Sequence, residues 1–416
     1  MTRVVGPMTG AGVERVAVAR NGTPVLRDVT LRAADGELLV VLGSSGSGKS
    51  TLLRVIAGLD PVSSGKVIIK DRDVTALPPG QRRAAMVFES SALLPFLDVS
   101  DNLGWGLRAR RLPEAEVQER VSGRARQLRL SRLLSRRPGE LSHGERGLVG
   151  VGRALVQVPD VFLLDEPLAG LDTAQRTRVR QEIVGAVRSL GVTTLYVTHD
   201  QAEGLAVADR IALLHQGAVV QVGRPMELYR RPVDLYVAGF VGTPPIGLLP
   251  ARLVSAAGQA GFVVGDRTLP LWRPVPSPLR DHVGREVVLG FRSEDVREAT
   301  ADRHDPDSVT LETVATHAEF TGRQNVVTVA VHAPSVTTPG TELSTDSPPG
   351  ATLRSFFPPE AVIRPGDAVG VAVRGERAHV FDAVTGRALW HPQDGSDGEP
   401  EGHSGDLPAT GGDAAR

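Results

Sequence analysis

The first 240 residues combine two kinds of hydrophobic pattern. Short apolar runs are separated by longer segments in which apolar residues recur at helical spacing. The pattern, with turn residues at Asn21-Gly22 and Asp35-Gly36, predicts strands within 13–42 and at 67–69, 84–88, 161–164, 193–198 and 211–214. Helices are expected after residue 51 and at 100–135, 141–156 and 173–190. Such alternation indicates a parallel α/β sheet covered on both faces, with a helical lobe beside it.

The pattern changes beyond residue 240. A segment with several Gly and Pro residues at 239–250 resembles a linker, and the residues after it read as short alternating strands. These strands are expected at 261–264, 287–291, 326–331, 369–373 and 379–381. They predict a small β-barrel domain. The predicted organisation is a loose N-terminus at 1–12, an α/β domain at 13–240 with helices at about 90–155, a barrel domain at 241–390 with an exposed insert at 333–359, and a disordered tail at 391–416.

Composition narrows the class of protein. Hydrophobic residues make up 41% of the 416 residues, which is enough for two or three domain cores. The net charge of -1 argues against a globally basic nucleic-acid binder, and we expect no nucleic-acid partner. The absence of cysteine excludes disulfides, cysteine-ligated zinc and thiol catalysis. We also expect no signal peptide and no membrane-spanning segment, because no long apolar run is present.

One motif in the first domain has a specific chemistry. The stretch Gly43, Ser44, Ser45, Gly46, Ser47, Gly48, Lys49, Ser50, Thr51 matches G-x-x-x-x-G-K-[ST] and lies between a buried strand and a helix. Its glycines let successive backbone N–H groups point inward, and the helix N-terminus adds partial positive charge, which together form an anion cradle. Lys49 would reach the β- and γ-phosphates, and Ser50 would ligate Mg²⁺. The alternative is a Gly/Ser-rich surface turn that matches the pattern by chance. It is disfavoured because the chain contains only three lysines, so a chance lysine at the required position is improbable.

A second motif lies about 115 residues downstream. The apolar run at 161–164 ends in Asp165 and Glu166, the Walker B pattern. Asp165 would hold Mg²⁺ through water, and Glu166 would orient and polarise the attacking water. The alternative, a strand whose acids cap the next helix, does not explain why the pair follows a phosphate-binding loop.

Four further stretches resemble the motifs of the ATP-binding cassette (ABC) family, in that family's order. Residues 141–145 (LSHGE) are similar to its LSGGQ signature, 168–172 to its D-loop, 196–200 to its switch-histidine strand, and 87–90 to its Q-loop. The resemblance extends over residues 13–240. It implies an α/β P-loop NTPase cassette with a helical subdomain, and ATP and Mg²⁺ as cofactors.

The family resemblance also implies a mechanism. Two cassettes pack head to tail as a homodimer or a paired cassette, and each ATP lies between one P-loop and the other subunit's signature. Ser142, Gly144 and Glu145 would complete the site of the opposite subunit. Lys49, Glu166 and His199 would be catalytic, with His199 linking the γ-phosphate to Glu166. Glu89 would join Ser50 and Asp165 as a metal ligand.

The C-terminal half resembles a narrower group. Residues 216–225 and 237–242 are similar to the end of the cassette in importers of the maltose and glycerol-phosphate type, and 289–295 and 381–389 to their OB-like regulatory domain. This resemblance implies an importer ATPase at the cytoplasmic face of the cell membrane, followed by a small all-β, OB-like barrel domain. Its partners would be the coupling helices of a permease, docked at Ser91–Asn102 through Leu93, Leu94, Phe96 and Leu97, and indirectly a substrate-binding protein.

Several positions depart from the family pattern. Glu89 replaces the Q-loop glutamine, His143 and Glu145 replace a glycine and a glutamine of the signature, and Gly147-Leu148 replace the usual Gln-Arg. Arg20 stands near the expected adenine-stacking aromatic, and its guanidinium could stack on the base. Four interpretations stay open. Two are importers, either of a sugar or glycerol phosphate, or of a polyamine or metal ion. The other two are a slow or regulatory cassette whose barrel binds a ligand or regulator, and a non-transport cassette that acts on DNA or ribosomes.

Overall fold

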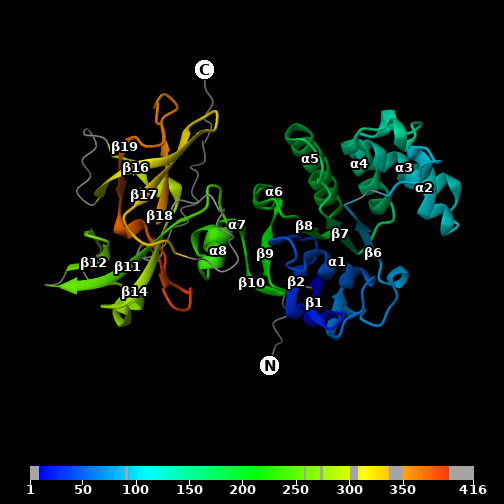
Figure 1. Cartoon of the computed structure of the whole chain (residues 1–416). Helices are drawn as coiled ribbons and strands as arrows, with labels where there is room; N and C mark the ends of the chain where they lie inside the picture. Colours follow the sequence, from blue (N-terminus) through cyan, green and yellow to red (C-terminus); the bar gives the residue numbers. More distant parts are fainter. Residues whose placement is uncertain are drawn as a thin grey trace, which may run out of the picture. The chain divides into compact units, whose positions relative to one another are not determined.

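The computed structural model describes residues 9–89, 92–256, 259–271, 275–299, 308–336 and 350–392. The chain forms two compact units that divide between Thr243 and Pro244, and Figure 1 shows both. Among the described residues, no helix is long and apolar enough to cross a membrane. The predictions for residues 1–8, for Ser90 and Ser91, for much of the insert and for the tail beyond residue 392 lie outside the described residues.

The first unit contains an antiparallel sheet at its N-terminal side. The sheet has the order β2-β1-β4-β5, formed by β1 (Thr9–Arg20), β2 (Thr23–Ala34), β4 (Ser64–Ile69) and β5 (Arg72–Asp73). Asn21 and Gly22 both have positive φ, at 50° and 79°, and join β1 to β2 in a two-residue hairpin. Such a turn matches the twist of the strands that it connects, as the Asn-Gly pair predicted.

The second sheet of this unit positions the predicted site. Its strands are β10 (Ala218–Gly223), β9 (Arg210–His215), β3 (Leu38–Leu42), β8 (Thr193–Val197), β7 (Val161–Asp165) and β6 (Ala84–Val87), in that order. All neighbours are parallel except β10 with β9. The carboxyl ends of β3, β7 and β8 therefore meet at one edge, where ligands bind in open α/β sheets.

This sheet is buried on both faces, which explains its continuous apolar strands. Leu39 and Val41 of β3 face one hydrophobic core together with helix α1 (Lys49–Ala57) and the antiparallel sheet. Leu38, Val40 and Leu42 face a second core with the later helices. Because successive side chains of a strand point to opposite faces, one strand contributes to two cores.

The remaining helices of the first unit follow the sheet strands. They are α2 (Val99–Ala109), α3 (Glu114–Gln127), α4 (His143–Leu155), α5 (Thr173–Leu190), α6 (Gln201–Val207), α7 (Pro225–Arg230) and α8 (Leu235–Phe240). The helical pattern predicted over 100–135 is broken between α2 and α3. Pro113 precedes α3 as its N-cap, and a proline disfavours helical conformation in the residue before it.

The second unit has an open sheet and a closed barrel that share one hydrophobic core. The sheet contains β13 (Arg267–Pro270), β12 (Gln259–Val264), β11 (Gly247–Ala256), β14 (Glu286–Phe291), β20 (His379–Asp382) and β21 (Ala388–Trp390). The barrel contains β15 (Arg297–Glu298), β18 (Ala351–Phe357), β17 (Asn325–Val331), β16 (Val309–Phe320) and β19 (Ala368–Val373). The barrel was predicted, but the strands expected at 261–264, 287–291 and 379–381 belong to the open sheet.

Three segments differ from the sequence-based expectation. The insert at 333–359 was expected to be an exposed loop, but residues 351–357 form β18, with alternate side chains buried. Residues 9–12 were expected to be loose, but they are buried in β1. A Cβ on Gly10 would lie 2.2 Å from Thr193 Oγ1, so the glycine-rich composition there reflects close strand packing. His391, at the start of the predicted tail, is also buried.

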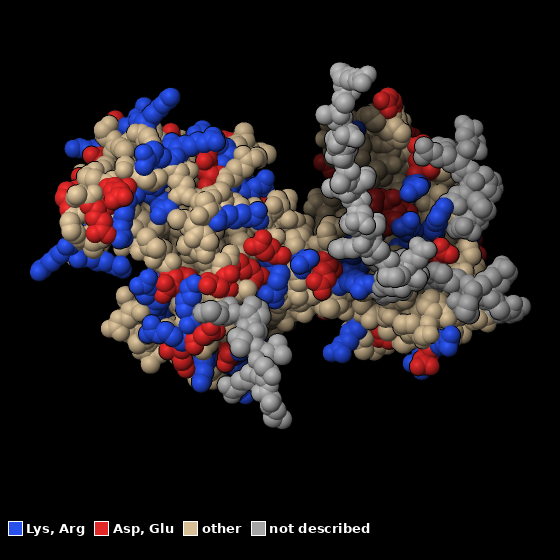
Figure 2. Space-filling model, turned by 180° about the vertical axis from the view of Figure 1, so that it is seen from behind, with Lys and Arg blue, Asp and Glu red and all other residues tan. Residues whose placement is uncertain are grey.

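On the face shown in Figure 2, basic and acidic residues are interspersed on both units. The arrangement agrees with the balance of 47 basic and 48 acidic residues in the sequence.

Candidate nucleotide-binding and hydrolysis site

The P-loop connects β3 to α1 through glycines with unusual backbone conformations. Gly46 and Gly48 have φ of 77° and 103°, values that L-residues with side chains rarely adopt. Gly43 approaches β9 so closely that a Cβ there would lie 2.2 Å from the Leu214 carbonyl oxygen. Helix α1 starts at Lys49 with an αL residue, Gly48, as its N-cap. The strand, loop and helix expected around the motif are therefore present.

Lys49 is buried within this loop, with only 5% of its surface exposed. Its Nζ donates hydrogen bonds to the carbonyl oxygens of Gly43 and Ser44, both at 2.9 Å. Burial lowers the pKa of Lys49, and the negative charges of Glu166 and Asp165 act in the opposite direction. The ammonium is thus held in the cradle, close to the two Walker B carboxylates.

Ser50 and Asp165 connect the two motifs directly. Ser50 Oγ donates a hydrogen bond of 2.9 Å to Asp165 Oδ1 at the end of β7. Burial raises the pKa of Asp165, the Ser50 hydrogen bond opposes this, and the like charges of Glu166 and Glu89 raise it further. A hydroxyl beside crowded carboxylate oxygens suits Mg²⁺, whose charge would relieve their repulsion. Among the described residues no three His, Cys, Asp or Glu side chains cluster as metal ligands.

Glu166 and His199 form a pair at the same edge of the sheet. His199 Nδ1 lies 2.8 Å from Glu166 Oε2, although the residues are 33 positions apart. Glu166 has a positive φ of 48°, which is uncommon for a residue other than glycine, and its N–H donates to the Val197 carbonyl of β8. Strained backbone of this kind clusters at functional sites. The pair has the geometry of a base that is oriented by a histidine.

Two features follow strand β6: Glu89, and a segment that Asn102 of α2 holds in place. Glu89 is exposed beyond the end of β6, near enough to Asp165 to affect its pKa. Asn102 is fully buried, and its amide binds the backbone of Leu94, Leu97 and Asp98. The role of Asn102 was missed, because a single buried Asn on a helix gives no sequence signal.

The signature residues form the start of helix α4. Ser142 is the N-cap: its Oγ accepts from the Glu145 N–H at 3.3 Å, and the Glu145 carboxylate accepts from the Ser142 N–H at 2.8 Å. This capping box satisfies two backbone donors, and the S-x-x-E spacing could have revealed it. His143 lies against the D-loop, since a Cβ on Gly170 would be 3.5 Å from its Nε2. Gly144 is buried against Val179 of α5.

Arg20 has a clear partner within the chain. Its guanidinium forms an ion pair with Asp60, which Arg54 of α1 also binds at 3.0 Å. Burial acts to raise the pKa of Asp60, but hydrogen bonds from Arg54 and Arg20 hold it below its ordinary value. The contacts of Arg20 therefore assign it an ion pair, and its stacking on adenine stays a prediction.

Comparison with known proteins places this arrangement in a family. Residues 26–169 match the family model described as "ABC transporter". The trehalose/maltose import ATP-binding protein MalK of Thermococcus litoralis is 39% identical over 391 residues, covering 91% of this chain and all of that protein. The chain belongs to the ABC import ATP-binding proteins. Proteins of this family are ATPases, and the structure brings the P-loop and the Walker B strand together at one edge of the sheet.

Other ABC proteins support the assignment. Two sn-glycerol-3-phosphate import ATP-binding proteins named UgpC are similar to this chain. The protein of Cereibacter sphaeroides is 39% identical over 368 residues, which cover 88% of this chain and 96% of that protein. The protein of Salmonella typhimurium is 43% identical over 290 residues, which cover 70% of this chain and 80% of that protein. Among solved structures, cbiO1 from Clostridium perfringens, part of the ABC transporter complex cbiONQ, has a TM-score of 0.51 and 27% identity. The match covers 54% of this chain and 92% of cbiO1.

Proposed function

We propose that this ABC import ATP-binding protein hydrolyses ATP to drive the uptake of a sugar or of glycerol phosphate. The observation that carries the proposal is the Ser50–Asp165 hydrogen bond, which joins the P-loop to the Walker B strand at the point where Mg²⁺ would lie. The substrate class follows from the relatives, which are named for trehalose/maltose and sn-glycerol-3-phosphate import.

Each residue of the site has a defined role in this proposal. The P-loop N–H groups and Lys49 bind the phosphates, and Lys49 exchanges its bonds to the Gly43 and Ser44 carbonyls for bonds to phosphate oxygens. Ser50 and Asp165 hold Mg²⁺, with Glu89 beside them; the ion neutralises phosphate charge. Glu166 accepts a proton from the attacking water, and His199 keeps the Glu166 carboxylate in position.

The proposed assembly is a head-to-tail pair of cassettes beneath a permease. Ser142 and Gly144 complete the nucleotide site of the opposite subunit through the N-terminus of α4. Phe96 is 65% exposed on the segment ordered by Asn102 and offers an apolar contact for a coupling helix of the permease. The chain then acts at the cytoplasmic face of the cell membrane, and a substrate-binding protein delivers the solute to the permease.

The P-loop lysine tests the hydrolytic part of the proposal. Lys49→Ala removes the buried ammonium, and we expect ATP hydrolysis by the purified chain to fall by about a hundredfold or more, as when a preorganised charge stabiliser is lost. Lys66→Ala is the matched control, since Lys66 is exposed on β4 and its Nζ lies 3.7 Å from Asp73. A Lys49→Ala chain that hydrolyses ATP at the rate of the Lys66→Ala chain would contradict the proposal.

The transport part is tested in membranes. The tagged chain, extracted with mild detergent, is expected to bring down permease subunits, and cells that lack it should lose uptake of labelled maltose or glycerol 3-phosphate. Uptake should return with the natural chain but not with Lys49→Ala. Unchanged uptake of both solutes in the deletion strain would rule out these substrates while leaving the ATPase result intact.

A further inference from the structure

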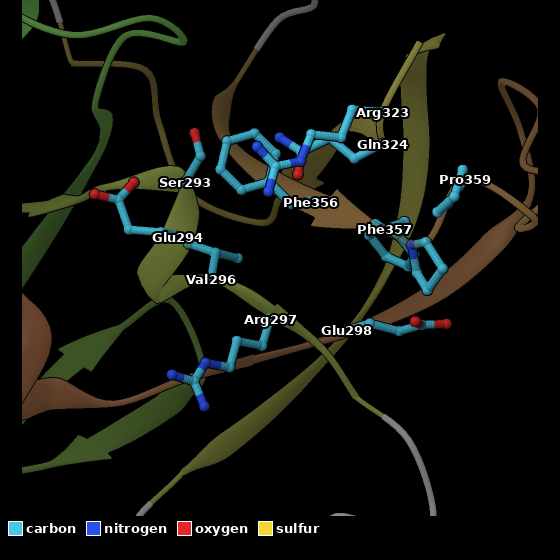
Figure 3. Close-up of a pocket in the computed structure, with 11 residues that line it drawn as sticks. Ser293, Glu294, Val296, Arg297, Glu298, Arg323, Gln324, Phe356, Phe357 and Pro359 are labelled. Atoms are coloured by element: carbon cyan, nitrogen blue, oxygen red, sulfur yellow. The ribbon is translucent and has the colours of Figure 1, made fainter. Parts of the chain in front are cut away.

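A cavity of about 580 Å³ opens on the barrel side of the second unit, far in sequence from every nucleotide-site residue. Figure 3 shows the side chains around it, which come from η5 (Ser293–Asp295), β15, the β16–β17 turn, β18 and the segment after β18. Its volume falls within the range of about 300–1,000 Å³ that small-molecule sites occupy. Its residues take no part in the hydrolytic site.

The walls of this cavity are held in place by buried hydrogen bonds. Ser355 Oγ donates to the Val296 carbonyl at 2.6 Å and ties β18 to the segment that leads into β15. Asn325 donates to the carbonyls of Pro358 and Ala361, at 2.8 and 2.9 Å, and fixes the chain that follows β18. Such bonds make the cavity a preformed feature of the fold, which lowers the cost of ordering it around a ligand.

The third wall is a tight turn between β16 and β17. Thr321 binds the Gln324 carbonyl through both its N–H, at 3.0 Å, and its Oγ1, at 2.9 Å. Gly322 has a φ of 85°, which completes the turn. Arg323 and Gln324 line the cavity from this turn, and within the described part of the chain their side chains have no hydrogen-bonding partner. They are therefore available to a ligand.

The lining combines apolar rings with polar groups of balanced charge. Phe356, Phe357, Pro358 and Pro359 provide the apolar surface. Arg297 and Arg323 are matched in number by Glu294 and Glu298, so the cavity has no net charge. Ser293, 3% exposed, adds a buried hydroxyl that lacks a hydrogen-bonding partner among the described residues. Balanced charge disfavours phosphates and other anions, and the two arginines beside the two carboxylates disfavour a metal cation.

We infer that this cavity binds a neutral carbohydrate of one or two rings. The faces of a sugar ring are apolar and pack on aromatic side chains such as Phe356, whereas its hydroxyls donate and accept around the whole perimeter. Gln324 can both donate and accept, Arg323 and Arg297 donate, and Glu298 accepts, so polar partners lie on separate walls. An amino acid would use its one carboxylate and one ammonium, and would leave several of these polar groups without a partner.

Calorimetric titration of the full chain without ATP tests this site, with glucose, maltose and trehalose as probes. We expect at least one of them to bind saturably, and Gln324→Ala and Phe356→Ala each to weaken it by about tenfold. Phe320→Ala and Arg364→Ala are the matched controls, because both residues are exposed on this unit and neither lines the cavity. These controls should bind like the natural chain.

Three outcomes would overturn the inference: no saturable binding of any of the three sugars, equal binding by the Gln324→Ala chain, or displacement of the sugar by inorganic phosphate or phenylalanine. Gln324 lies on a surface turn, so its variant keeps the test valid if Phe356→Ala fails to fold. The inference is independent of the proposed hydrolysis. A negative titration leaves the ATPase function standing, and the Lys49→Ala result does not bear on this cavity.

Discussion

Charges of opposite sign lie close together at the P-loop. Burial lowers the pKa of Lys49 and raises that of Asp165, and the opposite charge of each group acts against the shift of the other. Glu166 and Glu89 add like charge around Asp165. A divalent cation at Asp165 would relieve this repulsion, and Glu89 is the carboxylate that departs from the family pattern.

Replacing Glu89 by Gln tests what this extra charge does. Glu89→Gln removes a negative charge near the position of the γ-phosphate, so we expect the KM for ATP to fall by about threefold to tenfold at saturating Mg²⁺, as for partly screened charges. The pKa of Asp165 should also fall, which extends activity to lower pH. Steady-state ATPase assays over ATP concentration and pH measure both effects. Glu119→Gln, on the exposed face of α3, is the control, and identical kinetics for the two variants would exclude a role for Glu89.

The positions of the P-loop and Walker B residues at one edge of the sheet followed from the motifs, but the partners of other residues did not. Lys49, Ser50 and Asp165 could be singled out because binding of phosphate and Mg²⁺ would require those residue types at fixed spacing. Arg20 was predicted to stack on adenine from its position alone. Its ion pair with Asp60 joins residues 40 positions apart and depends on how α1 ends, which no local pattern encodes.

At the scale of elements, helix α4 shows that a departure from the family pattern can satisfy a structural need. Glu145 stands at the N3 position, where either Glu or Gln can close a capping box with Ser142. We expect Glu145→Ala to lower the free energy of unfolding by about 0.5–1 kcal/mol and Glu145→Gln to leave it nearly unchanged. Denaturant unfolding of the chain measures the difference. Equal stability of the two variants would mean that the capping box contributes nothing.

The segment before α2 offers a test of permease docking. Asn102 binds three backbone carbonyls of this segment, so Phe96 is exposed on an ordered surface. We expect Phe96→Asp to abolish uptake by the assembled transporter and to leave hydrolysis by the isolated chain within about twofold, since surface changes rarely perturb the fold. Phe320→Asp, at a Phe that is 61% exposed in the other unit, is the control. If hydrolysis by the isolated chain is lost together with uptake, Phe96 contributes to ATP hydrolysis and not only to permease docking.

Elements were predictable where a single physical requirement shaped the sequence. The parallel strands are buried on both faces, so their continuous apolar runs were clear. Strand β18 was missed because its alternation is embedded in a Pro/Thr/Ser-rich segment. The division of the C-terminal strands between sheet and barrel was also hidden, since alternation shows which face is buried but not which strand lies beside it.

At the scale of the whole molecule, the hydrophobic cores separate cleanly. Both clusters of the first unit contain only residues up to Val241, and the cluster of the second unit starts at Leu249. A unit with its own core can unfold on its own. We therefore expect two transitions in calorimetry of the full chain. A ligand of the first unit, such as ATP with Mg²⁺, should raise only one of them, because binding stabilises the unit that it binds.

The second transition should also depend on pH, through His379. This side chain is 2% exposed, and burial together with the charge of Arg292 and the neighbouring His391 lowers its pKa to about 3. Between that value and about 6.5 the unfolded chain binds a proton that the folded unit does not. The contribution of the neutral His379 to the stability of the second unit is therefore fully present above about pH 6.5. It is lost as the pH falls, by about 2 kcal/mol at pH 5.

A His379 variant separates this effect from general acid sensitivity. His379 Nδ1 lies 2.9 Å from that of His391 inside the core of the second unit, so His379→Gln removes the titrating group while keeping a polar side chain there. In calorimetry at pH 7 and pH 5, the second transition of the natural chain should fall on acidification more than that of the variant, while the first transition moves equally in both. If the second transition shifts equally in the natural chain and in the variant, His379 is not the group that couples protons to unfolding. If only one transition is seen, the two units do not unfold independently.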